Sequence, residues 1–427
     1  MTAPPARATE RLVLVLSAGF AALEGYDLAC YGATVPSLLA DHSMAATKAS
    51  AGTVGSLLAV GMMLGAGLAG ALVAIGMLLG AAICAATIRR AGSRRLLIGG
   101  AGLFSLGMLV CAIAPTFALF GAARLAVGVG LGIVLPTVTA YVADLSAPER
   151  RARNVGIMMS GYAAGALLAP LLGAALLTGG SWRWIYVIGA APAFVLLPLA
   201  IRMLPESPVH EESGGAVARG DLLGLRPLLA PGVRGATLLF WAMSFCGLLL
   251  VFGISTWLPT IMQTAGYSLG SSLLQTAALW VGAGVGMVLG GRIADRVGIK
   301  PVVAVAFLAG AGSLLVMSAR PALGVLFLLM FVGGLGLIGS QVLTNAYIVG
   351  HHPPELRGRA IGWALSIGRL GAIAGPLIGA AILSSGLGVA WNFYLFAVPG
   401  IIGALLALAV PAIRSRAAAP DTARVTA

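Results

Sequence analysis

The sequence predicts an all-α membrane protein of twelve transmembrane helices, arranged as two six-helix bundles with both termini in the cytoplasm. Composition, the length of the apolar runs and the placement of basic residues support this prediction. The chain of 427 residues is 59% hydrophobic but only 9% charged, and its mean hydropathy is +1.01. A soluble domain carries about 25% charged residues because its surface must be hydrated. Most of this surface therefore faces lipid, and the 61 glycines fit close helix packing there.

Twelve apolar runs are long enough to cross a hydrocarbon core of about 30 Å, which needs roughly 20 helical residues. They cover approximately residues 12–39, 50–87, 95–114, 117–143, 154–178, 183–204, 234–258, 270–292, 300–318, 321–349, 359–384 and 391–413. The second run is longer than a bilayer requires, because the segment 57–66 recurs almost unchanged as 72–81. We expect this run either to tilt and project from the membrane or to break at a glycine.

The longest hydrophilic stretch separates six runs from six. It is rich in acidic residues and glycine, which is typical of a linker. We therefore divide the chain into an N-terminal bundle (1–204), a central cytoplasmic linker (205–233) and a C-terminal bundle with a short tail (234–427). Two such halves are the plan of a transporter built from repeats, whose site lies at the midplane between them.

The basic residues predict the orientation, because Lys and Arg are enriched in cytoplasmic loops. With both termini inside, all but five of the 26 Lys and Arg residues lie on the cytoplasmic side. Lys48, Arg183 and Arg320 lie outside, whereas Arg124 and Arg369 lie within apolar runs. The net charge of +13 thus reflects short loops, and we do not expect nucleic-acid binding.

Enzymes and metal proteins usually carry signals that this sequence lacks. The four cysteines, Cys30, Cys84, Cys111 and Cys246, lie singly inside apolar runs, so neither a disulfide framework nor a metal-ligand spacing is present. We find no nucleophile–base pair and no soluble catalytic domain. We therefore predict no enzymatic activity, no cofactor and no metal.

Ionisable residues within a membrane span are costly and are candidate functional residues. Glu24, Asp27 and Tyr31 are spaced three and four residues apart, which places them on one face of the first helix. We predict that one carboxylate, Asp27 before Glu24, carries a proton, while Arg124 or Arg369 binds a substrate anion through its planar guanidinium. The alternative is that Asp27 or Glu24 pairs with Arg124 and only holds the helices together.

Four further side chains are candidates for substrate contact. Gln341 and Asn345 lie four residues apart in a glycine-rich apolar run, where an uncompensated amide is costly. The rings of Tyr31 and Trp363 are suited to contact a ligand, although such residues serve equally in packing or at the membrane interface. We add these four to Arg124 and Arg369 as predicted substrate-binding residues.

Several loop motifs resemble those of the major facilitator superfamily. Gly291–Gly298, which reads Gly-Arg-Ile-Ala-Asp-Arg-Val-Gly, resembles the superfamily's signature Gly-x-x-x-Asp-Arg-x-Gly. The segment 121–128 around Arg124 resembles its fourth-span arginine motif, and 144–151 resembles the end of that span. The resemblance implies the major facilitator fold. It also implies gating roles for Asp295, Arg296, Asp144 and Arg150.

A finer resemblance is to the aromatic acid:proton symporter family, and within it to benzoate-type carriers. That family has an Asp-Gly-[Tyr/Phe]-Asp motif in its first span, and this chain has Glu24-Gly25-Tyr26-Asp27. The segments 257–272 and 345–376 resemble its seventh-span exit and its tenth and eleventh spans. The resemblance implies a multi-pass protein of the bacterial inner membrane that imports a small aromatic carboxylate, such as benzoate or a hydroxybenzoate, together with protons, by alternating access.

The same resemblance places the family's essential acids at Glu24 and Asp27, and its intramembrane arginines at Arg124 and Arg369. Two positions depart from the family pattern: Glu24 replaces an aspartate, and Arg89 stands where the family has a gate aspartate. Proton-coupled efflux of a drug or metabolite and a non-transporting sensor paralogue therefore stay open as alternatives. The expected partners are the aromatic acid, protons and the lipid bilayer, and we expect a monomer.

Overall fold

The computed structural model describes residues 7–41, 43–44, 93–146, 150–204, 225–353 and 356–411, and every regular element in these ranges is a helix. Eleven of the described helical segments are long and apolar enough to cross a membrane. The all-helical, multi-pass prediction is therefore confirmed for this part of the chain. The expected run 50–87, with its internal repeat, and most of the expected linker lie outside the described residues, so the twelfth span stays a prediction.

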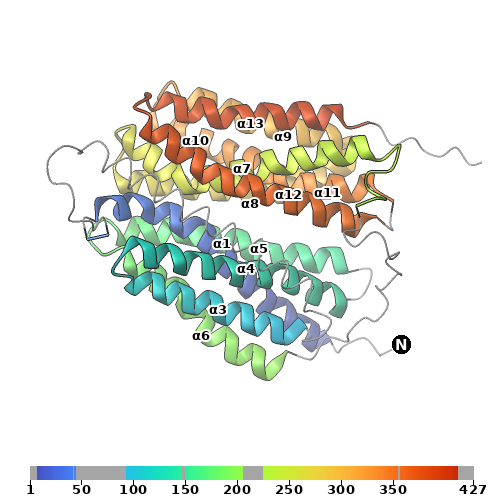
Figure 1. The fold of residues 1–427 in the computed structure, drawn as a ribbon, viewed down its shortest axis with the longest axis horizontal. Helices are drawn as coiled ribbons and strands as arrows, with labels where there is room; N and C mark the ends of the chain where they lie inside the picture. The colour runs from blue at the N-terminus through green and yellow to red at the C-terminus, as the bar shows by residue number, and fades with distance from the viewer. Residues whose placement is uncertain are drawn as a thin grey trace, which may run out of the picture.

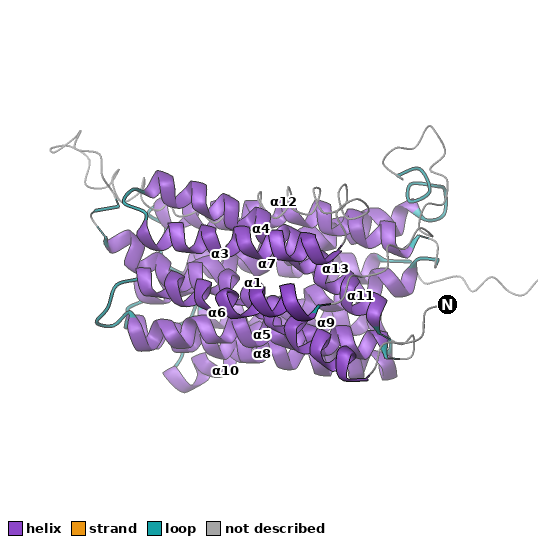
Figure 2. Cartoon of the chain, turned by 90° about the horizontal axis from the view of Figure 1, so that it is seen from below, coloured by secondary structure: helices purple, strands orange, loops and turns teal. Residues whose placement is uncertain are grey.

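The N-terminal half contributes five described helices, which pack as one bundle (Figure 1). Figure 2 shows that the described elements of both halves are helices. They are α1 (Arg7–Ala40), α3 (Ser93–Ile113), α4 (Phe117–Leu145), α5 (Arg151–Leu176) and α6 (Arg183–Met203). Within this bundle α1 packs along α5, and α3 packs along α4. Each helix coincides with a predicted run to within a few residues, because the thickness of the membrane sets the length of both the apolar stretch and the helix.

The C-terminal half contains a second bundle. Its elements are α7 (Arg234–Thr264), α8 (Leu269–Val297), α9 (Ile299–Met317), α10 (Leu323–Gly333), η2 (Gly334–Ile338), α11 (Gly339–His351), α12 (Arg357–Ser384) and α13 (Ala390–Ala409). α10, η2 and α11 follow one another without a break and together form one span. The helices α7 and α8 extend several residues beyond the predicted runs, and apolar residues such as Ile261 and Val297 lie in these extensions.

The segment η2 is a π-helical turn that the sequence did not predict. It begins at Gly334, where a Cβ atom would collide with the backbone carbonyl of Leu279 on α8. A π-turn widens a helix locally and occurs frequently at functional sites. In this span it directly precedes α11, which carries Gln341 and Asn345.

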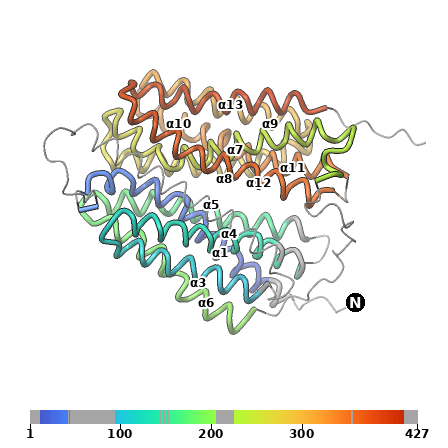
Figure 3. The backbone as a smooth tube through the Cα atoms, in the orientation of Figure 1, coloured from blue at the N-terminus to red at the C-terminus, as the bar shows by residue number. Residues whose placement is uncertain are grey.

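The two halves touch through α1 with α7 and through α5 with α8. Gly32 of α1 lies against the carbonyl of Ser255 on α7, and Gly173 of α5 faces Leu273 on α8. These contacts lie toward the end of the molecule where α1 finishes. Toward the opposite end, where the N-terminus lies, α3 and α6 tilt away from the C-terminal bundle (Figures 1 and 3).

Glycines permit the close approach of α1 and α5. A Cβ atom at Gly165 of α5 would collide with the carbonyl of Ala22 on α1, whereas Gly156 of the same helix has open space around it. We predict that Gly165→Ala lowers the free energy of unfolding by about 1–3 kcal/mol, the usual cost of overpacking. The matched variant Gly156→Ala should be neutral or slightly stabilising, because alanine favours a helix. Unfolding in mixed micelles measures both, and equal stabilities would show that this contact is not tight.

Candidate functional site

The acidic face of α1 points into the protein, as its spacing predicts. Glu24, Asp27 and Tyr31 are 3%, 0% and 2% exposed. Gly25, between the two acids, lies directly against the carbonyl of Tyr162 on α5, so this turn of α1 has no room to shift away from α5. The carboxylates are therefore held at fixed positions in the middle of the molecule.

Asp27 forms a buried ion pair with Arg124 of α4. The Nη1 atom of Arg124 donates to Oδ1 of Asp27, and Nη2 donates to Oδ2 at 3.1 Å. This two-point geometry is the strongest that an arginine and a carboxylate can make. Both residues belong to the N-terminal bundle, so the pair joins α1 to α4 and does not cross between the halves.

Aromatic rings surround the Arg124 guanidinium. Its Cζ atom lies 5.0 Å from the ring centroid of Tyr31 and 6.0 Å from that of Tyr186 on α6. A cation over an aromatic face is stabilised by the ring quadrupole, and more so where water is excluded. The Tyr186 hydroxyl lies 2.9 Å from the Thr34 hydroxyl of α1. Tyr31 and Arg124, which were both predicted to contact substrate, thus lie together in a site that Asp27 already fills.

Glu24 lies in a second cluster, which joins the two halves. Its Oε2 atom is buried and has no hydrogen-bond partner among the described residues. The cation that interacts electrostatically with it is Arg369 of α12, and both interact with Tyr162 of α5. Glu24 and Tyr162 belong to one half and Arg369 belongs to the other. This cluster is therefore the place where charges of the two halves meet.

Aromatic side chains flank the Glu24 cluster. The Tyr162 ring lies edge-on to Trp280 of α8, with centroids 6.4 Å apart, and the Arg369 Cζ atom lies 6.0 Å from the Phe252 ring of α7. Trp280 and Phe252 were not predicted as site residues. Nothing in their sequence context distinguishes them from packing residues, since only the neighbouring charges give them a chemical role.

The two predicted amides lie together on α11. Gln341 Nε2 donates to Asn345 Oδ1 at 3.3 Å, while Gln341 Oε1 is buried without a partner among the described residues. Gln341 fits against α7 only because Gly247 has no side chain at the contact. Trp363 of α12 packs instead on Trp241 of α7, with ring centroids 6.0 Å apart.

The predicted gating residues lie at helix ends. Asp295 and Arg296 occupy the last turn of α8, where both are exposed, and within the described ranges they form no ion pair. Arg150 is the residue before α5. Asp144 lies in the last turn of α4, and its side chain is outside the described part. Their gating roles stay predictions.

Comparison with known proteins assigns the family. The profile described as Major Facilitator Superfamily matches residues 18–281 and 269–425. The chain belongs to the major facilitator superfamily. It is therefore a multi-pass membrane transporter and not an enzyme, as the loop motifs predicted.

Curated relatives within the superfamily include several aromatic acid transporters, which confirms the finer resemblance. The chain is 33% identical to a gentisate transporter of Corynebacterium glutamicum, over 92% of this chain and 86% of that protein. It is 31% identical to a benzoate transport protein of Acinetobacter baylyi (92% and 87% covered) and 31% identical to a gallate transporter of Pseudomonas putida (98% and 96% covered).

Solved structures support the fold of this facilitator. The crystal structure of a D-xylose–proton symporter is similar with a TM-score of 0.78 and 20% identity, over 94% of this chain and 98% of that chain. The crystal structure of a nucleoside transporter is similar with a TM-score of 0.73 and 14% identity, over 94% of this chain and 99% of that chain. At these identities the likeness concerns the fold alone, and it confirms the predicted major facilitator architecture.

The geometry of the Asp27–Arg124 pair predicts a stability effect. Asp27→Asn leaves the Arg124 charge buried without its counter-ion, which should lower the free energy of unfolding by about 3–5 kcal/mol. The double variant Asp27→Asn with Arg124→Gln should recover much of that loss, because no unpaired charge remains. Unfolding in mixed micelles measures all three proteins.

The exposed Asp295→Asn serves as the acid-to-amide control, with an expected change within about 0.5 kcal/mol. A single variant at Asp27 that is as stable as the wild type would contradict a structural role for the pair.

Proposed function

We propose that this facilitator is a proton-coupled symporter that imports small aromatic carboxylates, with Glu24 as the proton carrier and Arg369 as the carboxylate-binding residue. The observation that carries the proposal is the cluster of Glu24, Tyr162 and Arg369 across the two halves. A carboxylic acid and a cation that interact between moving halves are placed to respond to both substrate and proton. The aromatic acids named for the curated relatives support the substrate class.

The proposed coupling follows from competition for one cation. A substrate carboxylate that binds Arg369 through two parallel hydrogen bonds takes the place of Glu24 as its counter-ion. A buried carboxylate without a counter-ion favours its neutral form. Glu24 would then take up a proton, and the halves would move with the cluster neutralised. Release of the substrate would return Arg369 to Glu24 and expel the proton.

This assignment reverses the order in which the sequence ranked the two acids. Asp27 is held by two hydrogen bonds from Arg124 inside one bundle, so we propose that this pair fixes α1 and does not exchange protons or substrate. We propose that Phe252, Trp280 and Tyr162 contact the aromatic ring, since such rings prefer offset or edge-on contacts at these separations. Gln341 and Asn345 would meet polar ring substituents.

We further propose that both termini are cytoplasmic, in line with the distribution of Lys and Arg. In that orientation the contacts of α1 with α7 and of α5 with α8 lie on the outer side, and the conformation faces inward. Uptake then requires that these contacts open while the cytoplasmic ends approach, which is the rocking expected of such repeats.

Glu24→Gln tests the proton carrier. In proteoliposomes with an imposed pH gradient, we expect this variant to lose concentrative uptake of labelled benzoate but to retain exchange of benzoate across the membrane, because exchange needs no net proton movement. Glu24→Asp is the matched control and should retain accumulation, since it keeps the acid.

Full accumulation by Glu24→Gln would remove Glu24 from this role. Outward movement of benzoate under the same gradient would favour efflux, and binding without any flux would favour a sensor.

Arg369→Lys tests the carboxylate site. Lysine keeps the charge but loses the planar two-point contact, so the KM for benzoate should rise roughly 10- to 100-fold, as expected for the loss of a hydrogen bond to a charged group. Initial uptake rates over a range of benzoate concentrations measure it. Arg320→Lys, at the exposed turn before α10, should leave KM unchanged. An unchanged KM in Arg369→Lys would place the carboxylate elsewhere.

A further inference from the structure

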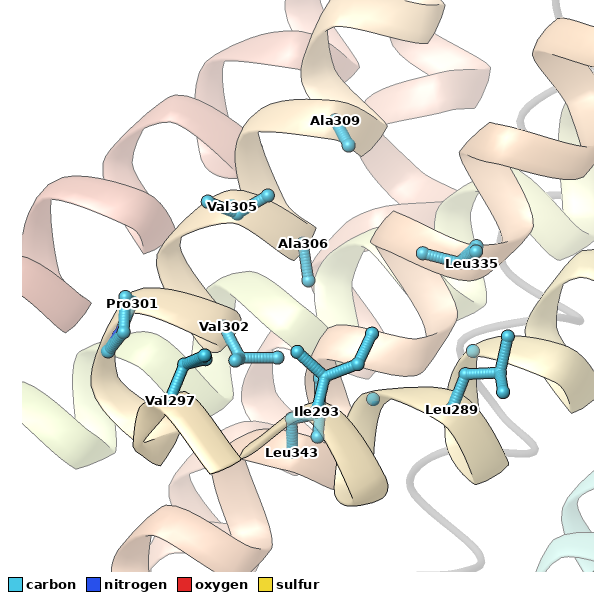
Figure 4. Close-up of a pocket in the computed structure, with 12 residues that line it drawn as sticks. Leu289, Ile293, Val297, Pro301, Val302, Val305, Ala306, Ala309, Leu335 and Leu343 are labelled. Carbon is cyan, nitrogen blue, oxygen red and sulfur yellow. The ribbon is translucent and has the colours of Figure 1, made fainter. Parts of the chain in front are cut away.

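An apolar groove lies on the side of the C-terminal bundle formed by α8 and α9 (Figure 4), and its lining contains no residue of the charged clusters. It has a volume of about 280 Å³ and lies between α8, α9 and the span formed by η2 and α11. Figure 4 shows Ile293, Val302 and Leu343 gathered together from three helices. All of its lining residues are apolar: Gly286, Leu289, Gly290, Ile293, Val297, Pro301, Val302, Val305, Ala306, Ala309, Leu335 and Leu343.

Small residues form the floor of the groove and large exposed residues form its rims. The floor includes Gly290 and Ala306, and a Cβ atom at Gly290 would already touch Leu343. On the rims, Val297 and Val305 are 62% and 63% exposed. Both residues belong to membrane-spanning helices, so the groove opens toward lipid.

The length of the groove matches one leaflet of the bilayer. From Gly286 to Val297, α8 rises about 16 Å at 1.5 Å per residue. That is about half of the ~30 Å hydrocarbon core. An extended acyl chain that enters from one membrane surface can therefore lie along the whole groove without crossing the midplane.

The groove ends at a basic cluster. Arg296 directly precedes Val297 in the last turn of α8, is exposed, and forms no ion pair within the described ranges. Arg292 lies one turn earlier, and Lys300 lies in the first turn of α9. The Lys300 ammonium donates a hydrogen bond to the Val410 carbonyl at 2.8 Å and so points toward the end of α13, where it adds to the positive charge of this surface.

Helix geometry places Arg296 beside the groove and the nearest acid away from it. At 100° per residue, Arg296 lies next to the stripe of Leu289, Ile293 and Val297, whereas Asp295 lies on the opposite side of α8. The first turn of α9 adds backbone N–H groups that no side chain caps, and these favour an anion. An apolar slot thus leads into a cationic end.

We propose that this groove is a binding site for an anionic phospholipid, with one acyl chain in the slot and the phosphate on Arg296 beside the uncapped N-terminus of α9. Basic pockets between helices at the membrane surface are suited to such headgroups. A zwitterionic lipid would bring a second cation to a site that is already positive. A second copy of the chain, packed symmetrically on the same face, would bring two basic clusters together.

The first experiment compares ligands on the purified full-length protein in neutral detergent. Phosphatidylglycerol should raise the melting temperature and remain bound in native mass spectrometry. Phosphatidylcholine of the same chain length should bind more weakly, and inorganic phosphate should have no effect. Equal binding of the two lipids, a phosphate effect as large as that of phosphatidylglycerol, or a dimer that excludes the lipid would each overturn the proposal.

The second experiment locates the site with two matched pairs of variants. Ala309→Phe fills the groove and should abolish the phosphatidylglycerol effect, whereas Leu308→Phe, exposed on the same helix but outside the groove, should not. Arg296→Gln should weaken phosphatidylglycerol binding roughly fivefold, the contribution of one basic residue at an anionic surface. Arg320→Gln, at the opposite end of α9, should leave it unchanged.

Wild-type affinity for phosphatidylglycerol in both Ala309→Phe and Arg296→Gln would show that the lipid does not bind at this site. Should Ala309→Phe fail to fold, the exposed Arg296 and Arg320 variants still decide, because neither side chain contributes to the core.

Discussion

The cost of burying charge in a low-dielectric interior governs this structure. Within the described residues, Glu24, Asp27, Arg124 and Arg369 lie deep inside membrane spans, and each needs a partner because hydrocarbon offers none. The two acids, Asp27 and Glu24, interact with their arginines in different ways. Asp27 and Arg124 satisfy each other within one bundle through two hydrogen bonds. Glu24 and Arg369 interact electrostatically across two bundles, so their interaction depends on how the halves are arranged.

These two arrangements suit different tasks. An ion pair whose two residues belong to one rigid bundle can keep its hydrogen bonds in every conformation. It can therefore act as an anchor that stabilises the bundle, but it does not respond to substrate. A pair divided between halves is remade whenever the halves move or a competing anion arrives. The Oε2 atom of Glu24, which has no hydrogen-bond partner in the described part of the chain, fits the second case, because a group that must change partners cannot have all of its hydrogen bonds fixed by the fold.

The sequence predicted the spans and the buried charges well, because lipid imposes length and apolarity on each run and makes every intramembrane charge conspicuous. It also placed Glu24 and Asp27 on one face. It did not predict which arginine each acid meets. Helical spacing fixes the direction of a side chain along its own helix, whereas the partner depends on where other helices lie. The π-turn at Gly334 was not predicted for a related reason, since a glycine within a helix is equally consistent with close packing and with π-helical geometry.

The anchor and the proposed coupling site are linked through α1 itself. Asp27 and Glu24 are three residues apart on one helix, so the hydrogen bonds that hold Asp27 also fix the rotation of α1 and hence the direction of Glu24. The close contact of Gly25 with the Tyr162 carbonyl prevents α1 from sliding along α5. α1 must then move with its bundle as one body. The interaction of Glu24 with Arg369 instead crosses between the halves, so it changes when the halves rock.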